Sequence, residues 1–329
     1  MSQLKDKLDI FIITYNREKE LGKTLAQLYS ETSPVKDFYI TVLDNASTDG
    51  TETLCKSYAQ NHPKFKYIKN NRNIGAVLNV IKAMELANKE WYWILGDDDN
   101  YNWDAWAEIE DALNCDKYEA VYTCWHDGAK SIEYRYLLNE AGFLATAIIK
   151  TQNLTSTVMQ NAGYVSLSMD PHCAPIAKII NEKGNIYIPY QKLVLENMCK
   201  NFSYIKSKDE QLHPDIRNHN IIYSKLRVYQ LLINKNLRYE SNEILCLGSD
   251  FISSMNFMLD IGLDLKRLVE VLFMLNLRQK LVLLWIIIVR KLKKFFSIHA
   301  IWKMEKTEKK RHLTILGIKI TTNRKKEKI

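Results

Sequence analysis

The sequence predicts an α/β fold, with a doubly wound, mainly parallel sheet and a helical C-terminal extension. Three observations carry this prediction. Short apolar runs rich in β-branched residues alternate with amphipathic segments of about 10 to 15 residues. Polar motifs follow directly after several of these runs. The chain has 329 residues, of which 47% are hydrophobic, and only 11 Gly and 6 Pro. That composition suits a large globular core and excludes a long disordered linker.

The expected elements follow one another from the N-terminus. Strands are predicted at residues 8–14, 38–44, 65–70, 91–95, 119–125, 142–150 and 185–189. Helices are predicted around residues 21–29, 51–61, 74–84 and 174–183, and the chain is expected to be mostly helical from residue 223. Asn16 is placed to cap the first helix, and Asp49, with Glu52 three residues on, is placed to cap the second.

The charge is unevenly distributed along the chain. Residues 262–329 hold 18 Lys or Arg against 5 Asp or Glu, whereas the rest holds 28 against 33. We therefore expect two regions, residues 1–222 and 223–329, and an anionic surface as the partner of the second. The six cysteines are scattered and form no CxxC pair, and the N-terminus lacks a signal peptide, so a reduced cytoplasmic location is expected.

The sharpest local feature is the acidic loop Gly96-Asp97-Asp98-Asp99, directly after the strand at 91–95. Three adjacent carboxylates repel one another, and a hard divalent cation such as Mn or Mg is the simplest way to keep them ionised. The alternative is a solvated acidic turn that caps a helix around Trp103.

Polar residues also follow the first three strands, where a nucleotide would lie in a parallel sheet. Asp44 could accept a hydrogen bond from a base N–H, and Arg72 could face the base or the phosphates. The alternatives are structural: Asn16 and Asp49 as helix caps, Gly75 as a helix-entry turn, and Arg72 as a surface charge. The expected nucleotide-binding residues are Thr14, Tyr15, Asn16, Arg17, Asp44, Asn45, Arg72, Asn73, Gly75, Asn79, Asp97 and Asp98.

Four motifs carry a resemblance to a known family. In the order IITYNR, VLDNASTDGT, NRNIGAVLN and WILGDDD, they resemble the family 2 glycosyltransferases, which have the nucleotide-sugar-binding GT-A fold. The resemblance implies that Asp44 binds the nucleobase and that Asp97 and Asp99 hold Mn or Mg on the donor diphosphate. The LGDDD form is also similar to the abequosyltransferase-like branch of bacterial surface-glycan transferases.

The resemblance also implies a general base for the acceptor hydroxyl. The family's acidic pair is absent, but Ser168-Met169-Asp170-Pro171-His172 matches the layout, with a helix, Gly184 and a strand behind it. Asp170 is the first candidate and His172 the second, while Asp209 and Glu210 are a third option. Alternatively, Asp170 and Pro171 begin a helix and His172 is a buried core residue.

The C-terminal region has two further features. Residues 281–289 are apolar but too short to span a bilayer, and Arg290, Lys291, Lys293 and Lys294 follow at once. Such a segment is either a helix in the interface of an anionic membrane or a core helix with a solvated basic end. Beyond it, residues 313–321 are expected to form a hairpin between two basic triplets.

The function expected from all this is an inverting, metal-dependent glycosyltransferase. It would move a sugar from a nucleotide-sugar donor, preferably a UDP-sugar, to a hydroxyl of a lipid-linked bacterial surface glycan such as lipopolysaccharide or capsule. The expected location is peripheral, at the inner face of the cytoplasmic membrane. The alternatives are a sugar-nucleotidyltransferase and a non-enzymatic membrane-binding protein; no nucleic-acid motif accompanies the basic charge, so nucleic acid is not an expected partner.

Overall fold

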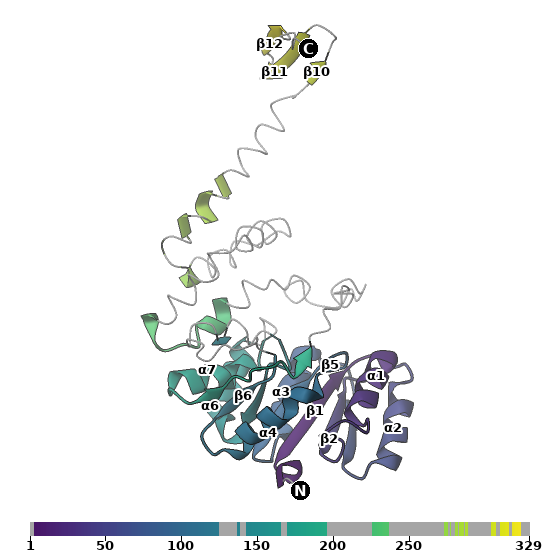
Figure 1. Cartoon of the computed structure of the whole chain (residues 1–329). Helices are drawn as coiled ribbons and strands as arrows, with labels where there is room; N and C mark the ends of the chain where they lie inside the picture. The colour runs from purple at the N-terminus through teal and green to yellow at the C-terminus, as the bar shows by residue number, and fades with distance from the viewer. Residues whose placement is uncertain are drawn as a thin grey trace. The chain divides into compact units, whose positions relative to one another are not determined.

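A computed structural model gives the structure of the chain (Figure 1). It describes residues 3–124, 137–138, 143–165, 170–195 and 226–236, separate residues within 273–288, and strands at 304–306, 310–315 and 318–323. The chain divides into two compact units, Met1–Ser254 and Met255–Ile329. The boundary expected between residues 222 and 223 lies outside the described residues and stays a prediction.

A seven-stranded sheet forms the centre of the first unit, in the order β3-β2-β1-β4-β7-β6-β8. Its four N-terminal strands are parallel, with β1 between β2 and β4, whereas β7 is antiparallel to both of its neighbours. The mainly parallel, doubly wound sheet is therefore confirmed. The strands are β1 (Leu8–Thr14), β2 (Tyr39–Asp44), β3 (Phe65–Lys69), β4 (Trp91–Leu95), β6 (Ala120–Tyr122), β7 (Ala147–Lys150) and β8 (Ile186–Tyr187).

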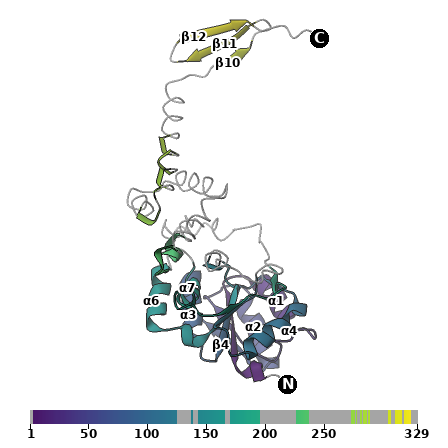
Figure 2. The ribbon, with the colours of Figure 1, turned by 60° about the vertical axis from the view of Figure 1, so that its left-hand side comes forward.

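Helices cover both faces of this sheet, as Figure 2 shows with α3, α6 and α7 on one side and α1, α2 and α4 on the other. They are α1 (Glu18–Leu28), α2 (Thr51–Asn61), α3 (Ala76–Leu86), α4 (Trp106–Asn114), α6 (Ser156–Val165) and α7 (Cys173–Asn181). Short 3₁₀ turns, η1 (Gln3–Asp6), η2 (Trp103–Ala105) and η3 (Thr151–Asn153), and a two-stranded ladder of β5 (Asn100–Tyr101) with β9 (Val194–Leu195) complete the unit.

The alternation of side chains along each strand separates two apolar cores. On β4, Trp91 and Trp93 pack with the helices α1, α2 and α4, while Tyr92 and Ile94 pack with α3, α6 and α7. All four side chains are at most 3% exposed. Burial of one large apolar side chain contributes about 1.5–3 kcal/mol, so this strand fixes the sheet between both helical layers.

The helix caps differ from those expected. Asn16 has a positive φ of 53° and does not cap α1; its Oδ1 accepts from the backbone N–H of Thr48. Asp49 serves both helices instead, because Oδ2 accepts from the N–H of Glu18 and Oδ1 from the N–H of Thr51. Glu52 completes no capping box, since it pairs with two lysines. The loop between β2 and α2 is thereby tied to the start of α1.

The second unit contains a three-stranded antiparallel sheet, β10 (Met304–Lys306), β11 (Lys310–Ile315) and β12 (Ile318–Asn323). The hairpin expected at residues 313–321 is present as β11 and β12, and β10 adds a strand that was not predicted. Helical residues occur between 273 and 288. Within the described part of the chain, no helix has the length and apolar character needed to cross a membrane.

Candidate active site

The polar motifs converge at the carboxyl edge of the parallel strands. Thr14, the last residue of β1, pairs in register with Asp44, the last residue of β2. On the other side of β1, Ile12 pairs with Leu95, the last residue of β4, so the acidic loop emerges beside Thr14. This is the edge where ligands bind in open parallel sheets.

Residues from the end of β1 hold the acidic loop. Thr14 Oγ1 donates to Asp97 Oδ2 at 2.7 Å, and Arg17 places Nε 2.9 Å from Asp97 Oδ1. Nη2 of the same guanidinium lies 2.5 Å from Asp98 Oδ2. Burial raises the pKa of Asp97 to about 7, against the opposing effects of the Arg17 charge and the Thr14 hydrogen bond. The sequence predicts these residues at one edge of the sheet. The structure brings them into contact although they are more than 80 residues apart in the sequence.

Helix α1 supports the backbone of the same loop. Thr24 is fully buried and its hydroxyl donates to the carbonyl of Asp97 at 2.8 Å. Gln27 donates to the carbonyl of Asp99 at 3.2 Å and accepts from the N–H of Tyr101 at 3.3 Å. Neither Thr24 nor Gln27 was predicted as a site residue from the sequence. Thr24 could have been noticed, because it is a polar residue beside Leu21, Leu25 and Leu28 on the apolar face of α1.

The acidic loop has a donor set that fits a divalent cation, because Mn and Mg prefer carboxylate oxygens. Asp99, only 2% exposed, is the second expected ligand beside Asp97. In this structure the guanidinium of Arg17 supplies the positive charge that faces Asp97 and Asp98. Across the described ranges, no three His, Cys, Asp or Glu side chains are grouped as a metal site. A cation bound at Asp97 would therefore replace Arg17 as the partner of that carboxylate.

Asp44, the expected nucleobase acceptor, is fully buried at the end of β2. Its Oδ1 accepts from the N–H of Ser47 at 2.8 Å, and its Oδ2 accepts from the hydroxyl of Tyr67 at 2.6 Å. Burial and the bond to the Asp44 carboxylate both raise the pKa of Tyr67. Tyr67, on β3, was not identified from the sequence, because an aromatic residue in a strand is ordinarily a packing residue.

An asparagine network shapes the turn after β3. Asn45 Oδ1 accepts from the N–H of Ile74 at 2.9 Å and from Asn70 Nδ2 at 3.1 Å. Asn70 Nδ2 also donates to Asn79 Oδ1, and Asn79 Nδ2 donates to the carbonyl of Leu43 at 2.9 Å. Asn45, Asn70 and Asn79 are buried, so the network ties the ends of β2 and β3 to α3. Asn70 was not among the predicted residues.

Besides Gly75 and the residues Arg17, Asp44, Asp97 and Asp98 described above, the predicted nucleotide-binding residues fall into two groups. Thr14, Asn45 and Asn79 are buried and hold the loops in place. The other group is exposed at the same edge and consists of Tyr15, Asn16, Arg72 and Asn73. Gly75 precedes α3 with a φ of 86°, a left-handed conformation that favours glycine, which confirms the expected helix-entry turn. Contact of either group with a nucleotide stays a prediction.

The candidate bases lie at the start of α7. Asp170 is 8% and His172 is 7% exposed. The helix begins at Cys173, and the carbonyl of Asp170 accepts from the N–H of that residue, so Pro171 is not the first helical residue. Asp209 and Glu210 lie outside the described residues. The identity of the base stays a prediction.

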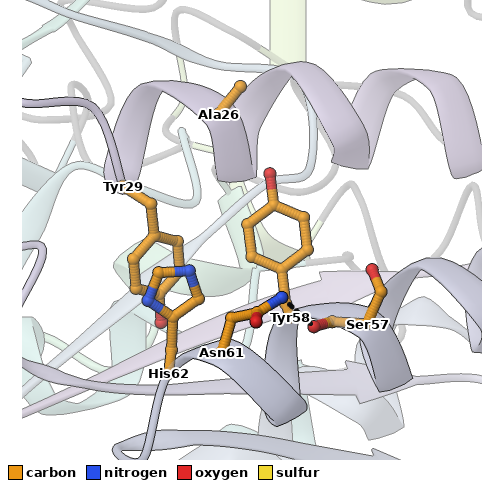
Figure 3. Close-up of a pocket in the computed structure, with 6 residues that line it drawn as sticks. All are labelled: Ala26, Tyr29, Ser57, Tyr58, Asn61 and His62. Atoms are coloured by element: carbon orange, nitrogen blue, oxygen red, sulfur yellow. Dashed lines mark hydrogen bonds between the residues drawn. The ribbon is translucent and has the colours of Figure 1, made fainter.

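A pocket of about 290 Å³ lies between α1 and α2 and is shown in Figure 3. Tyr29 and His62 stack in it with ring centroids 3.9 Å apart. These two residues follow the C-terminal ends of α1 and α2, and helices of βα units run back from the carboxyl edge of the strands. No residue of the acidic loop lines the pocket. Its lining residues are Ala26, Tyr29, Ser57, Tyr58, Asn61 and His62.

Residues 9–183 match the protein family described as Glycosyl transferase family 2. The match covers both the strand-end motifs and the acidic loop. The chain belongs to this family. The fold and family expected from the four motifs are confirmed.

Individual relatives of the chain are more distant. Abequosyltransferase RfbV of Salmonella typhimurium is 33% identical over 114 residues, which are 34% of each chain. An uncharacterised glycosyltransferase of Mycoplasma pneumoniae, the MG060 homolog, is 27% identical over 193 residues, 57% of each chain. The chain thus aligns with between a third and just over half of the length of these curated relatives.

Solved structures confirm the GT-A architecture. The structure of S. aureus TarS residues 1–349 in complex with UDP-GlcNAc superimposes with a TM-score of 0.57. It is 13% identical, and the match covers 96% of this chain and 98% of that one. The likeness concerns the fold, a mixed α/β structure with a mostly parallel central sheet.

Proposed function

We propose that this chain is an inverting, metal-dependent glycosyltransferase that transfers a sugar from a nucleotide-sugar donor to a hydroxyl of a lipid-linked bacterial surface glycan. The observation that carries the proposal is the junction of Thr14 and Arg17 with Asp97 and Asp98 at the carboxyl edge of the sheet. Family membership favours glycosyl transfer over the sugar-nucleotidyltransferase and the non-enzymatic alternatives.

The donor site of this proposal lies along the ends of β1 to β4. Asp44 accepts an N–H of the nucleobase, and the exposed Arg72 attracts the phosphates. Asp97 and Asp99 hold Mn or Mg, which when bound neutralises the diphosphate leaving group. A UDP-sugar is the favoured donor, supported by the UDP-GlcNAc bound in TarS, a protein of the same fold.

The acceptor side uses the start of α7. In the proposal, Asp170 takes the proton from the acceptor hydroxyl, with His172 as the second candidate. The oxygen then attacks the anomeric carbon from the face opposite to the leaving diphosphate, which inverts its configuration. Correct placement of donor and acceptor supplies much of the acceleration.

The acceptor class follows from similarity to an abequosyltransferase and from the charge of the chain. RfbV of Salmonella typhimurium carries that name, and a surface glycan such as lipopolysaccharide or capsule is the acceptor we propose here. The basic residues 262–329 would hold the enzyme at the anionic inner face of the cytoplasmic membrane, where a lipid-linked glycan is exposed.

Calorimetric titration of the full chain with UDP, CDP and dTDP, each with and without Mn²⁺, tests the donor site. We expect Mn-dependent binding of one nucleotide, lost in Asp97→Ala/Asp99→Ala and in the isosteric Asp97→Asn/Asp99→Asn. The matched control Asp37→Ala/Asp111→Ala removes two exposed carboxylates outside the site and should bind as the wild type does. Absence of binding for every nucleotide would overturn the proposal.

A further inference from the structure

Six large apolar side chains of the second unit are exposed to solvent. They lie on described helical residues between 273 and 288, which Figure 1 draws as short yellow-green coils. Their exposed fractions run from 48% to 84%. Large apolar side chains exposed together mark an interaction surface. We call them the apolar stripe: Phe273, Leu277, Leu281, Leu284, Trp285 and Ile288.

The stripe occupies one side of the helix. Leu275 lies in a bend, so Phe273 precedes the helical stretch that holds the other five members. At 3.6 residues per turn those five fall within an arc of about 100°. Leu283, which is 1% exposed, falls on the opposite side of this stretch. A helix of a globular protein normally exposes its polar side. This helix buries one apolar side and leaves a second one open.

The charge around the stripe identifies its partner. Residues 271–304 contain seven Lys or Arg and no Asp or Glu. A second copy of the same helix would bring equal positive charges together with no carboxylate in the segment to pair with them. A bilayer with anionic headgroups offers both an apolar interior and negative charge. The basic residues are Arg278, Lys280, Arg290, Lys291, Lys293, Lys294 and Lys303.

We propose that the apolar stripe inserts into the interface of an anionic bilayer, with the helix parallel to the membrane plane. Trp285 is suited to the headgroup boundary, because its ring has an apolar body and a polar N–H. Leu281 and Leu284 then enter the acyl region while the basic residues contact the headgroups. The inference rests on the membrane association proposed above and deepens it, since it names the side chains that make the contact.

Co-sedimentation of the full chain with vesicles tests this inference. Vesicles of phosphatidylcholine alone are compared with vesicles that contain phosphatidylglycerol as well. Leu281→Gln/Trp285→Gln removes the centre of the stripe without changing the charge, and Lys291→Gln/Lys293→Gln/Lys294→Gln removes charge without changing the stripe. Ile233→Gln is the matched control, because Ile233 is 77% exposed but belongs to the first unit.

We expect the wild type to bind the anionic vesicles only, and both test variants to bind about tenfold or more weakly. Ile233→Gln should bind as the wild type does. An equal affinity of Leu281→Gln/Trp285→Gln and wild type would overturn the inference, as would a dimer in analytical ultracentrifugation that only this variant dissociates. Nucleotide binding, measured in parallel without vesicles, separates failure of the stripe from failure of the donor site.

Discussion

The guanidinium of Arg17 lies against the carboxylate of Asp97, with Nε 2.9 Å from Oδ1. Arg17 follows β1 and Asp97 follows β4, so the contact joins the first and last parallel strands of the site. Asp97 Oδ2 also accepts a hydrogen bond from Thr14, so each carboxylate oxygen of Asp97 faces a polar group of the protein. Thr14 and Arg17 thus hold the acidic loop in place, and the metal that we propose must compete with the guanidinium of Arg17.

Replacement of Arg17 by Gln should have opposite effects on stability and on metal binding. The free energy of unfolding is expected to fall by about 1–3 kcal/mol, because a buried carboxylate loses its charged partner. Mn²⁺ should bind more tightly without nucleotide, since the guanidinium no longer competes. Denaturant unfolding measures the first effect, and the electron paramagnetic resonance signal of free Mn²⁺ measures the second.

Lys19→Gln is the control for Arg17→Gln, because it removes one exposed positive charge two residues away, in the first turn of α1. Arg17→Lys should be intermediate, since a single ammonium cannot reproduce the two-sided contact with Asp97 and Asp98. If Arg17→Gln and Lys19→Gln bind Mn²⁺ equally, Arg17 does not compete with the metal.

Variants of Asp44 and Tyr67 should have different effects, because Asp44 is proposed to contact the nucleobase whereas Tyr67 only holds Asp44 in place. Asp44→Asn is expected to lower nucleotide affinity about tenfold or more, the equivalent of about 1.4 kcal/mol, because a base N–H loses its acceptor. Tyr67→Phe removes only the hydroxyl that donates to Asp44 at 2.6 Å. It should lower the free energy of unfolding by about 1–2 kcal/mol and leave nucleotide affinity nearly unchanged.

Calorimetry and urea unfolding of both variants make that comparison. Equal losses of nucleotide affinity in Asp44→Asn and Tyr67→Phe would contradict a direct role of Asp44, and would indicate that either change merely distorts the end of β2.

The buried asparagine network should be costly to interrupt. Asn79→Ala removes the acceptor of one hydrogen bond from Asn70 and the donor to the carbonyl of Leu43, and we expect a loss of about 1–3 kcal/mol in urea unfolding. Asn61→Ala is the control, because Asn61 is exposed and donates only to a carbonyl of its own helix. Its effect should stay within about 0.5 kcal/mol. Equal effects would show that burial of the amide does not matter here.

Most elements of the parallel half of the sheet could be predicted from the sequence. Strands β1 and β4 and helix α2 have the predicted bounds, because buried runs and a 3.6-residue periodicity are strong local signals. The predicted strands at 119–125 and 142–150 were too long, since β6 and β7 cover only 120–122 and 147–150. Their ends are set by antiparallel pairing with each other and with β4, which no local pattern contains.

The site was predictable as an edge but not as a set of contacts. Polar residues after successive parallel strands must meet, so Asp44 and Asp97 could be placed together from the sequence. Which side chain reaches which depends on register and on loop conformation. Asn16, for example, has a left-handed backbone that turns its side chain toward Thr48 rather than toward α1. Thr24 and Tyr67 lie inside regular elements, where the local pattern indicates packing.

Asp49 offers a prediction that depends on pH. It caps both α1 and α2, and each cap contributes about 1 kcal/mol, so Asp49→Ala should lower the free energy of unfolding by about 2 kcal/mol near neutral pH. Burial raises the pKa of Asp49, but hydrogen bonds from Thr51 and from the N–H of Glu18 outweigh it and hold the pKa below the ordinary value of 3.8. A lowered folded-state pKa means that the stabilisation is complete above 3.8 and is lost as the pH falls through the folded-state pKa.

The free energies of unfolding of wild type and Asp49→Ala should therefore differ by the same amount at about pH 7 and pH 5, and the difference should shrink as the pH falls below 3.8. Glu52→Ala is the control, because Glu52 forms solvent-exposed ion pairs with Lys56 and Lys69, which contribute little to stability. An equal loss of stability in Glu52→Ala and Asp49→Ala would indicate that Glu52 caps α2, as the sequence predicts and the structure does not show. A difference between wild type and Asp49→Ala that persists in acid would mean that the carboxylate charge is not what joins the two helices.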